Sequence, residues 1–139
     1  MFIGEYHHSL DAKSRVALPA KFRGAFDKTA YLTKGMDGCI YIYTAEGFQK
    51  YFDSIIALNK NKADIREYQR AVFSRSIDAD LDTQGRILIN SQFAKMAGLT
   101  RECVFVGVGD HIELWSEDGW DNYINSVTDE QLEQISEEL

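Results

Sequence analysis

Residues 10–18 read Leu10-Asp11-Ala12-Lys13-Ser14-Arg15-Val16-Ala17-Leu18. The same pattern returns 71 positions later as Leu81-Asp82-Thr83-Gln84-Gly85-Arg86-Ile87-Leu88-Ile89. Phe22 and Phe93 keep the same spacing, and residues 40–48 correspond to residues 112–120. A match of this length predicts two copies of one supersecondary unit, related by a pseudo-two-fold axis.

Each copy is expected to contain two strands joined by a tight hairpin turn, a short helix, a second strand pair and a longer helix. The hairpin strands are predicted at residues 6–10 and 15–18, and again at 77–81 and 86–89. Pro19 is assigned the first position of a short helix that runs to residue 25, and Ser91 the cap of a helix that Gly98 ends. The second strand pairs are predicted at residues 31–33 with 39–43 and at 103–106 with 111–115.

Helix signals fill the remaining segments. Thr44 and Ser116 have the side chains of helix caps, and each is followed by an apolar helical stripe suited to the core or to a subunit contact. A helix from Ala63 to about Ser74 is predicted between the copies. The spacing of Thr128 and Gln131 predicts a capped, acidic C-terminal helix with a thin apolar stripe. Such a helix either packs on the body or a neighbouring subunit, or forms a frayed tail.

Charge is distributed unevenly along the chain. The net charge is −7, but residues 101–139 carry one Lys/Arg against eleven Asp/Glu, whereas residues 1–30 carry five Lys/Arg against three Asp/Glu. An acidic chain of this kind can still present a basic face, because charges more than about 8 Å apart are screened at physiological salt. No apolar stretch approaches the roughly 18 residues of a membrane span, and no leader pattern is present, so we expect a cytoplasmic protein.

The sequence carries no pattern of an enzyme. His7 and His8 are adjacent on a strand and point to opposite faces, so they do not readily share a metal. Cys39 and Cys103 lack metal-ligand spacing and are expected to be buried free thiols. There is no phosphate-binding glycine loop and no nucleophile elbow. We therefore expect no catalytic residue, no metal site and no cofactor.

The repeated Asp-x-x-x-Arg motif has a structural and a functional interpretation. Asp11 and Asp82 can accept hydrogen bonds from the turn backbone and pair with Arg15 and Arg86. That role leaves unexplained the other polar and basic side chains nearby, which suit contacts to DNA phosphates and base edges: Lys13, Gln84, Lys21 and Arg23. From the residues alone, DNA binding and an unspecific protein contact fit equally well.

Several stretches make the chain resemble the MraZ family of bacterial transcriptional regulators over essentially its whole length. They are Met1-Phe2-Ile3-Gly4-Glu5-Tyr6, both Asp-x-x-x-Arg motifs, Leu18-Pro19-Ala20-Lys21-Phe22-Arg23 and Glu113-Leu114-Trp115. The resemblance implies an α+β, β-rich fold: a tandem pair of AbrB-like swapped-hairpin units (a double-split β-barrel) with pseudo-two-fold symmetry and peripheral helices. The expected parts are a first repeat at residues 1–60, a linking helix at 61–75, a second repeat at 76–127 and an acidic helix at 128–139.

The resemblance also implies a function. It implies sequence-specific binding to double-stranded DNA, at short direct repeats in the promoter of the division and cell-wall operon, by a homo-oligomer that forms a closed ring. Association with the nucleoid in the cytoplasm follows, without a membrane partner. An alternative is a ring-forming protein-interaction or antitoxin-like module without specific DNA binding.

The same resemblance assigns roles to residues. It makes Arg15 and Arg86 the principal DNA contacts, with Lys13 beside the first. Local charge and position add further candidates, Lys21, Arg23 and Gln84, while Asp11 and Asp82 hold the loops. Ser14 departs from the glycine that the family commonly has there. If that position needs a positive φ, serine costs about 1 kcal/mol.

Overall fold

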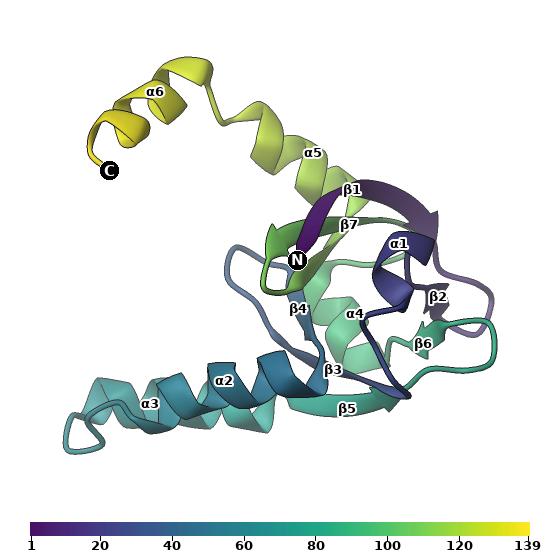
Figure 1. Ribbon diagram of the computed structural model, residues 1–139, viewed down its shortest axis with the longest axis horizontal. Helices are drawn as coiled ribbons and strands as arrows, with labels where there is room; N and C mark the ends of the chain where they lie inside the picture. The colour runs from purple at the N-terminus through teal and green to yellow at the C-terminus, as the bar shows by residue number, and fades with distance from the viewer.

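The computed structural model describes all 139 residues and has an α+β fold (Figure 1). A six-stranded antiparallel sheet has the order β1-β7-β8-β4-β3-β5, and a separate two-stranded ribbon is formed by β2 and β6. The strands are β1 (Phe2–Ser9), β2 (Arg15–Ala17), β3 (Thr29–Lys34), β4 (Ile40–Tyr43), β5 (Ser76–Asp80), β6 (Arg86–Leu88), β7 (Glu102–Gly109) and β8 (Ile112–Ser116). The helices are α1 (Ala20–Arg23), α2 (Ala45–Ile56), α3 (Ala63–Ser74), α4 (Ser91–Ala97), α5 (Glu117–Asn125) and α6 (Asp129–Glu137).

The two repeats exchange strands. β1 of the first repeat pairs with β7 of the second, and β5 of the second pairs with β3 of the first. The expectation that residues 6–10 and 15–18 form their own hairpin ladder, and likewise 77–81 and 86–89, was therefore wrong. Each of these strands takes its ladder partner from the other repeat. Within one copy the two strands are joined only at the turn, where the Asp11 N–H donates to the Arg15 carbonyl and the Asp82 N–H to the Arg86 carbonyl. The later strand pairs, β3 with β4 and β7 with β8, are antiparallel neighbours as predicted.

One core serves both repeats. A single cluster of 19 buried residues draws on both copies, including Val16 and Leu18 from the first and Ile87 and Phe93 from the second. Burying each such side chain contributes about 1.5–3 kcal/mol. Because neither repeat supplies a complete core alone, the strand exchange and the core reinforce one another.

Helix caps largely follow the sequence. The Thr44 and Ser116 hydroxyl oxygens accept hydrogen bonds from backbone N–H groups at the start of α2 and α5, and Thr128 forms the expected capping box with Gln131. The cap of α4 is Asn90, whose Oδ1 accepts from the Phe93 N–H at 2.8 Å, and not Ser91. The amide oxygen of Asn90 has the reach that the cap position requires, so Ser91 becomes the first helical residue. Similarly, Pro19 is the residue before α1 and not its first position.

Two helical arms project from the same side of the β-rich body (Figure 1). The first arm is the antiparallel pair α2 and α3, tied together by the Gln69 Nε2, which donates to the Ile55 carbonyl at 2.9 Å, and by a Phe52–Phe73 ring contact at 4.8 Å. The second arm is α5 followed by α6. Every residue from 128 to 139 is exposed. None of the helices is long and apolar enough to cross a membrane.

Candidate nucleic-acid interface

The two Asp-x-x-x-Arg loops lie side by side because β2 and β6 pair with each other. The register has the pseudo-two-fold symmetry that the repeat predicts, with the axis at one central pair: Arg15 opposite Leu88, Val16 opposite Ile87, and Ala17 opposite Arg86. The Leu18 N–H donates to the Gly85 carbonyl at 3.0 Å, and the Ile89 N–H donates to the Ser14 carbonyl at 2.9 Å. These two bonds are related by the same axis and extend the ribbon on each side.

One face of this ribbon carries both arginines. Val16 and Ile87 are buried, so their side chains point into the core. Side chains alternate along a strand, and residues opposite each other in an antiparallel pair share a face. The outward face therefore consists of Arg15, Ala17, Arg86 and Leu88. The two guanidinium groups lie on the same side of the molecule. Neither is buried, since the side chains of Arg15 and Arg86 are 33% and 28% exposed.

The first loop is organised by the Asp11 carboxylate. Its Oδ1 accepts from the backbone N–H groups of Lys13 and Arg15, both at 2.9 Å. Its Oδ2 accepts from the Arg15 Nε at 2.9 Å. One carboxylate thus closes the turn and fixes the guanidinium, while the two terminal nitrogens of Arg15 keep no protein partner.

The second loop repeats this arrangement. Asp82 Oδ1 accepts from the backbone N–H groups of Gln84 and Arg86 at 2.9 Å, and its Oδ2 accepts from the Arg86 Nε at 2.7 Å. The Arg86 Nη1 also lies 3.5 Å from Asp11 Oδ2, so the two loops are joined by an ion pair across the axis.

Hydrogen bonding keeps both carboxylates ionised. In each, the pKa lies below its usual 3.8, first because the backbone N–H of the loop arginine stabilises the charged form, and then through the other loop donors. Both loops are accordingly held in one charge state at neutral pH. Fixed donors of this kind suit recognition of an anion, because little ordering remains to be done on binding.

The loop tips require an unusual backbone. Ser14 has φ of 58° and Gly85 has φ of 72°, so the position does need a left-handed conformation. Lys13 and Gln84 are exposed beside these residues. Lys21 is exposed on α1. Lys13 and Gln84 are therefore at the loop tips, whereas Lys21 borders the first residues of β1, among them Ile3 and Gly4.

Arg23 has a structural contact that its charge did not suggest. Its Nη2 donates to the Leu18 carbonyl at 3.1 Å, and its guanidinium lies over Gly85, where a Cβ would overlap Nε and Cζ. It therefore links α1 of the first repeat to the loop of the second.

Leu88 is a surface residue that the sequence reasoning missed. Its side chain is 55% exposed on the arginine-bearing face. The sequence could have identified it, because side chains alternate along a strand and Leu88 lies between Ile87 and Ile89, which both face the core.

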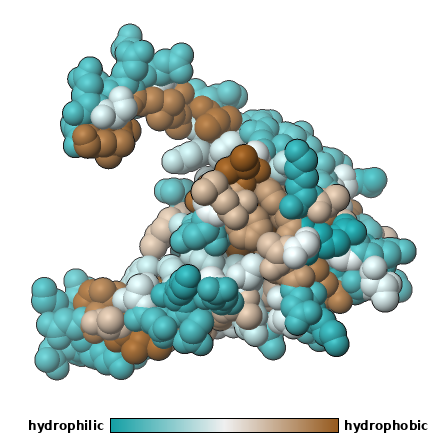
Figure 2. Space-filling view, in the orientation of Figure 1, coloured by the Kyte–Doolittle hydropathy of each residue, from teal (hydrophilic) through white to brown (hydrophobic).

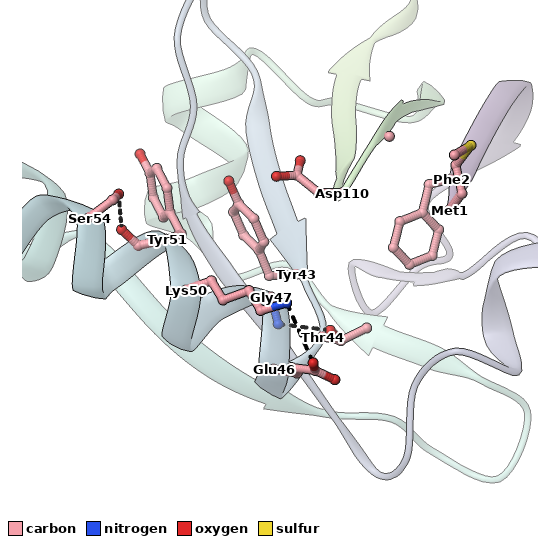
Figure 3. Close-up of a pocket in the computed structure, with 11 residues that line it drawn as sticks. Met1, Phe2, Tyr43, Thr44, Glu46, Gly47, Lys50, Tyr51, Ser54 and Asp110 are labelled. Atoms are coloured by element: carbon pink, nitrogen blue, oxygen red, sulfur yellow. Dashed lines mark hydrogen bonds and ion pairs between the residues drawn. The ribbon is translucent and has the colours of Figure 1, made fainter.

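A pocket of about 520 Å³ lies away from the loops, between the start of α2 and the β7–β8 turn (Figure 3). Tyr43, Tyr51 and Asp110 line it, but several of its polar atoms already serve α2: the Gly47 N–H donates to Thr44, and the Ser54 hydroxyl donates to the Tyr51 carbonyl. No group of three or more His, Cys, Asp or Glu side chains is placed to hold a metal ion anywhere in the chain. The pocket shows no arrangement suited to catalysis, so the ribbon remains the candidate site.

Comparison with known proteins agrees with this duplication. The family described as "MraZ protein, putative antitoxin-like" matches the chain twice, over residues 1–71 and 72–139. The chain is 38% identical to the transcriptional regulator MraZ of Lactobacillus helveticus (strain DPC 4571) and 35% identical to that of Mycoplasmoides gallisepticum (strain R(low / passage 15 / clone 2)). Both similarities cover 100% of this chain, and 96% and 97% of those relatives. With both halves matched and full-length relatives of this name, the chain belongs to the MraZ family.

Proposed function

We propose that this protein is a transcriptional regulator that binds specific double-stranded DNA through the outward face of the β2–β6 ribbon. Its relatives are named transcriptional regulators, which supports a role in transcription and not in catalysis. The observation that carries the DNA-binding proposal is the pair of oriented arginines, Arg15 and Arg86, on one face. Both terminal nitrogens of Arg15 and the Nη2 of Arg86 have no protein partner, while the Arg86 Nη1 pairs with Asp11.

A two-stranded antiparallel ribbon is an element that can enter a groove of DNA. The major groove of B-DNA, about 12 Å wide, admits a two-stranded antiparallel ribbon. Arg15 and Arg86 can then donate to guanine O6 and N7, the commonest specific contact of arginine. Lys13 and Gln84 are exposed at the loop tips, where they can contact phosphates or flanking bases. Lys21 is exposed on α1 and Arg23 lies over Gly85, and each can add a phosphate contact.

Differences between the two halves give the site a direction. Lys13 corresponds to Gln84 and Ala17 to Leu88, so the two loops present different side chains around a shared arginine. A strictly two-fold surface would favour a palindromic DNA sequence, whereas this surface favours a sequence that is not palindromic. We propose that this DNA sequence recurs as short direct repeats in the promoter of the division and cell-wall operon.

Several direct repeats call for several ribbons at fixed spacing. We propose that copies of the chain form a closed ring, so that the binding of one repeat raises the effective concentration for the next. The strand exchange seen here supports assignment to the AbrB-like swapped-hairpin class with a double-split barrel. In the cell, such a regulator would act in the cytoplasm on the nucleoid.

An electrophoretic shift titration tests the proposal. The DNA is the protein's own upstream region, and the controls are a scrambled fragment and a fragment lacking one repeat. We expect retardation of the first only, a steep loss of affinity with salt, and a more than proportional loss when a repeat is removed. Equal affinity for the scrambled fragment would overturn specific recognition.

The rival function is a protein-interaction or antitoxin-like module without specific DNA binding. The family description includes the term antitoxin-like, and the exposed arms are consistent with protein contacts. The same titration separates the two, because a protein-only module leaves the upstream fragment unshifted.

A further inference from the structure

The α5–α6 arm exposes an apolar side. Tyr123, Ile124, Leu132, Ile135 and Leu139 are each at least 40% exposed, and the last three recur at helical spacing. Figure 2 shows apolar side chains gathered along this arm on the side that faces the α2–α3 arm. Residues 117–139 also carry eight Asp/Glu and no Lys/Arg. The arm is therefore an acidic, amphipathic helical segment with an uncovered apolar stripe.

The α2–α3 arm has the complementary character. Residues 57–75 carry five Lys/Arg against two Asp/Glu. An open trough of about 570 Å³ on α3 is lined by Lys60, Arg66, Gln69, Arg70, Phe73 and Ser74, three cations and no acid. Ile56 and Leu58, near the tip, are 47% and 39% exposed. A basic surface with apolar side chains matches an acidic helix with an apolar stripe.

We propose that α6 of one copy docks on the α3 trough of a second copy, and that this contact builds the ring. Leu132, Ile135 and Leu139 would cover Phe73 and the apolar tip, while the acidic residues beside them face Lys60, Arg66 and Arg70. Both surfaces belong to the same sequence, which supplies the charge complementarity for a self-contact. The inference rests on the ring of the proposed function and specifies its interface.

The partner is a second copy because, within one chain, α6 does not pack against the α2–α3 arm. In one chain the two arms stand apart (Figure 1), and α6 has no buried residue. The two surfaces differ, so the contact is head-to-tail, and head-to-tail contacts generate closed rings or open filaments instead of simple two-fold dimers. Apolar side chains beside the cations favour a protein partner over DNA, which is held mainly through its phosphates.

The test uses two full-length variants whose changes lie at the surface. Leu132→Gln with Ile135→Gln removes the apolar stripe and keeps good helix formers. Lys60→Glu with Arg70→Glu reverses the charge of the trough. The control, Lys28→Glu with Lys95→Glu, makes the same change in charge at exposed residues that lie outside both helical arms. Native mass measurement without DNA reports the number of 15.8 kDa subunits in each sample.

The expected outcome is specific to a head-to-tail contact. The wild type and the control assemble, whereas each double variant alone is monomeric at concentrations where the wild type is assembled, with affinity lowered more than about a hundredfold for the charge reversal. Mixed one to one, the two variants give a heterodimer that grows no further, since only one intact α6 and one intact trough remain to meet.

Other results overturn the proposal. A wild type that is monomeric, a double variant that keeps the wild-type mass, or a mixture without heterodimers would each do so. If the charge reversal keeps its mass and loses DNA retardation, α3 is a DNA surface instead. The masses are measured without DNA, so the two proposals can fail separately. Assembly through this contact by a protein that does not retard the upstream DNA would overturn DNA binding and leave the interface. Retardation of that DNA by a monomeric wild type would overturn the interface and the ring and leave DNA binding.

Discussion

The guanidinium of Arg23 covers the backbone of Gly85, the loop residue of the other repeat. The corresponding pair is Ser14 and Ala94, where the first loop has a side chain and α4 has only a methyl group at the position of Arg23. Both loop residues have a positive φ, so strain alone does not explain why only one is glycine. The overlying arginine does, because Arg23 can keep its position and its hydrogen bond to the Leu18 carbonyl only if residue 85 has no Cβ.

Gly85→Ser should therefore destabilise the protein more than the backbone strain requires. We expect strain of about 1 kcal/mol and a further 0.5–1.5 kcal/mol, approximately, because a side chain at residue 85 displaces Arg23 and breaks its hydrogen bond to the Leu18 carbonyl. In an Arg23→Ala background, Gly85→Ser should lower the free energy of unfolding by the backbone strain alone. Urea unfolding of the four proteins of this double-mutant cycle measures the coupling, and a coupling near zero would contradict the contact.

Removing either loop arginine should weaken DNA binding and leave the fold intact. Arg15→Ala and Arg86→Ala each delete a partly exposed guanidinium whose loss should cost about 1–3 kcal/mol of binding, roughly 5- to 150-fold in affinity. Arg101→Ala, at a side chain that is 79% exposed outside the loops, is the control with the same change of charge. Titration of the upstream fragment and circular dichroism are the measurements. Unfolded Arg15→Ala protein would assign that arginine a structural role.

The sequence predicted the elements better than their pairing. The repeat, the Thr44 and Ser116 caps and the linking helix Ala63–Ser74 depend on local patterns and are confirmed. The exchange of β1 and β5 between repeats depends on which copy completes the core, and no local pattern encodes it. The repeat predicted two equivalent loops, but placing Arg15 and Arg86 on one face required the β2–β6 register.

The loop carboxylates should make stability depend on pH in the acid range. Their pKa values are lowered on folding, so their contribution is complete above about pH 4, the range of the unfolded carboxyls, and is lost as pH falls through the lower folded values. Unfolding free energy should thus fall with decreasing pH. Asp11→Asn with Asp82→Asn should be less stable at pH 7 and show a flatter acid dependence. Asp27→Asn, at an exposed residue without such bonds, should keep the wild-type slope in urea titrations.

Both cysteines should resist thiol reagents in the native protein. Cys39 and Cys103 are free and at most 1% exposed, and burial raises the pKa of the Cys103 thiol to about 12 and that of Cys39 also. The thiolate is the reactive form, so a disulfide reagent at pH 8 should modify neither residue until the protein unfolds. Absorbance of the released thiol, with and without urea, counts the reactive groups. Rapid reaction of one thiol in native protein would show that its strand opens locally.

Leu88 should read a thymine methyl group. It is exposed on the arginine-bearing face opposite Arg15, and an apolar side chain there can contact the methyl in the major groove. Replacing the contacted thymine by uracil removes one methyl, and at about 0.8 kcal/mol this should weaken wild-type binding roughly fourfold. Leu88→Ala, which gives the second half the residue that Ala17 supplies in the first, should bind both DNAs alike. Retained discrimination in that variant would assign the methyl contact to another residue.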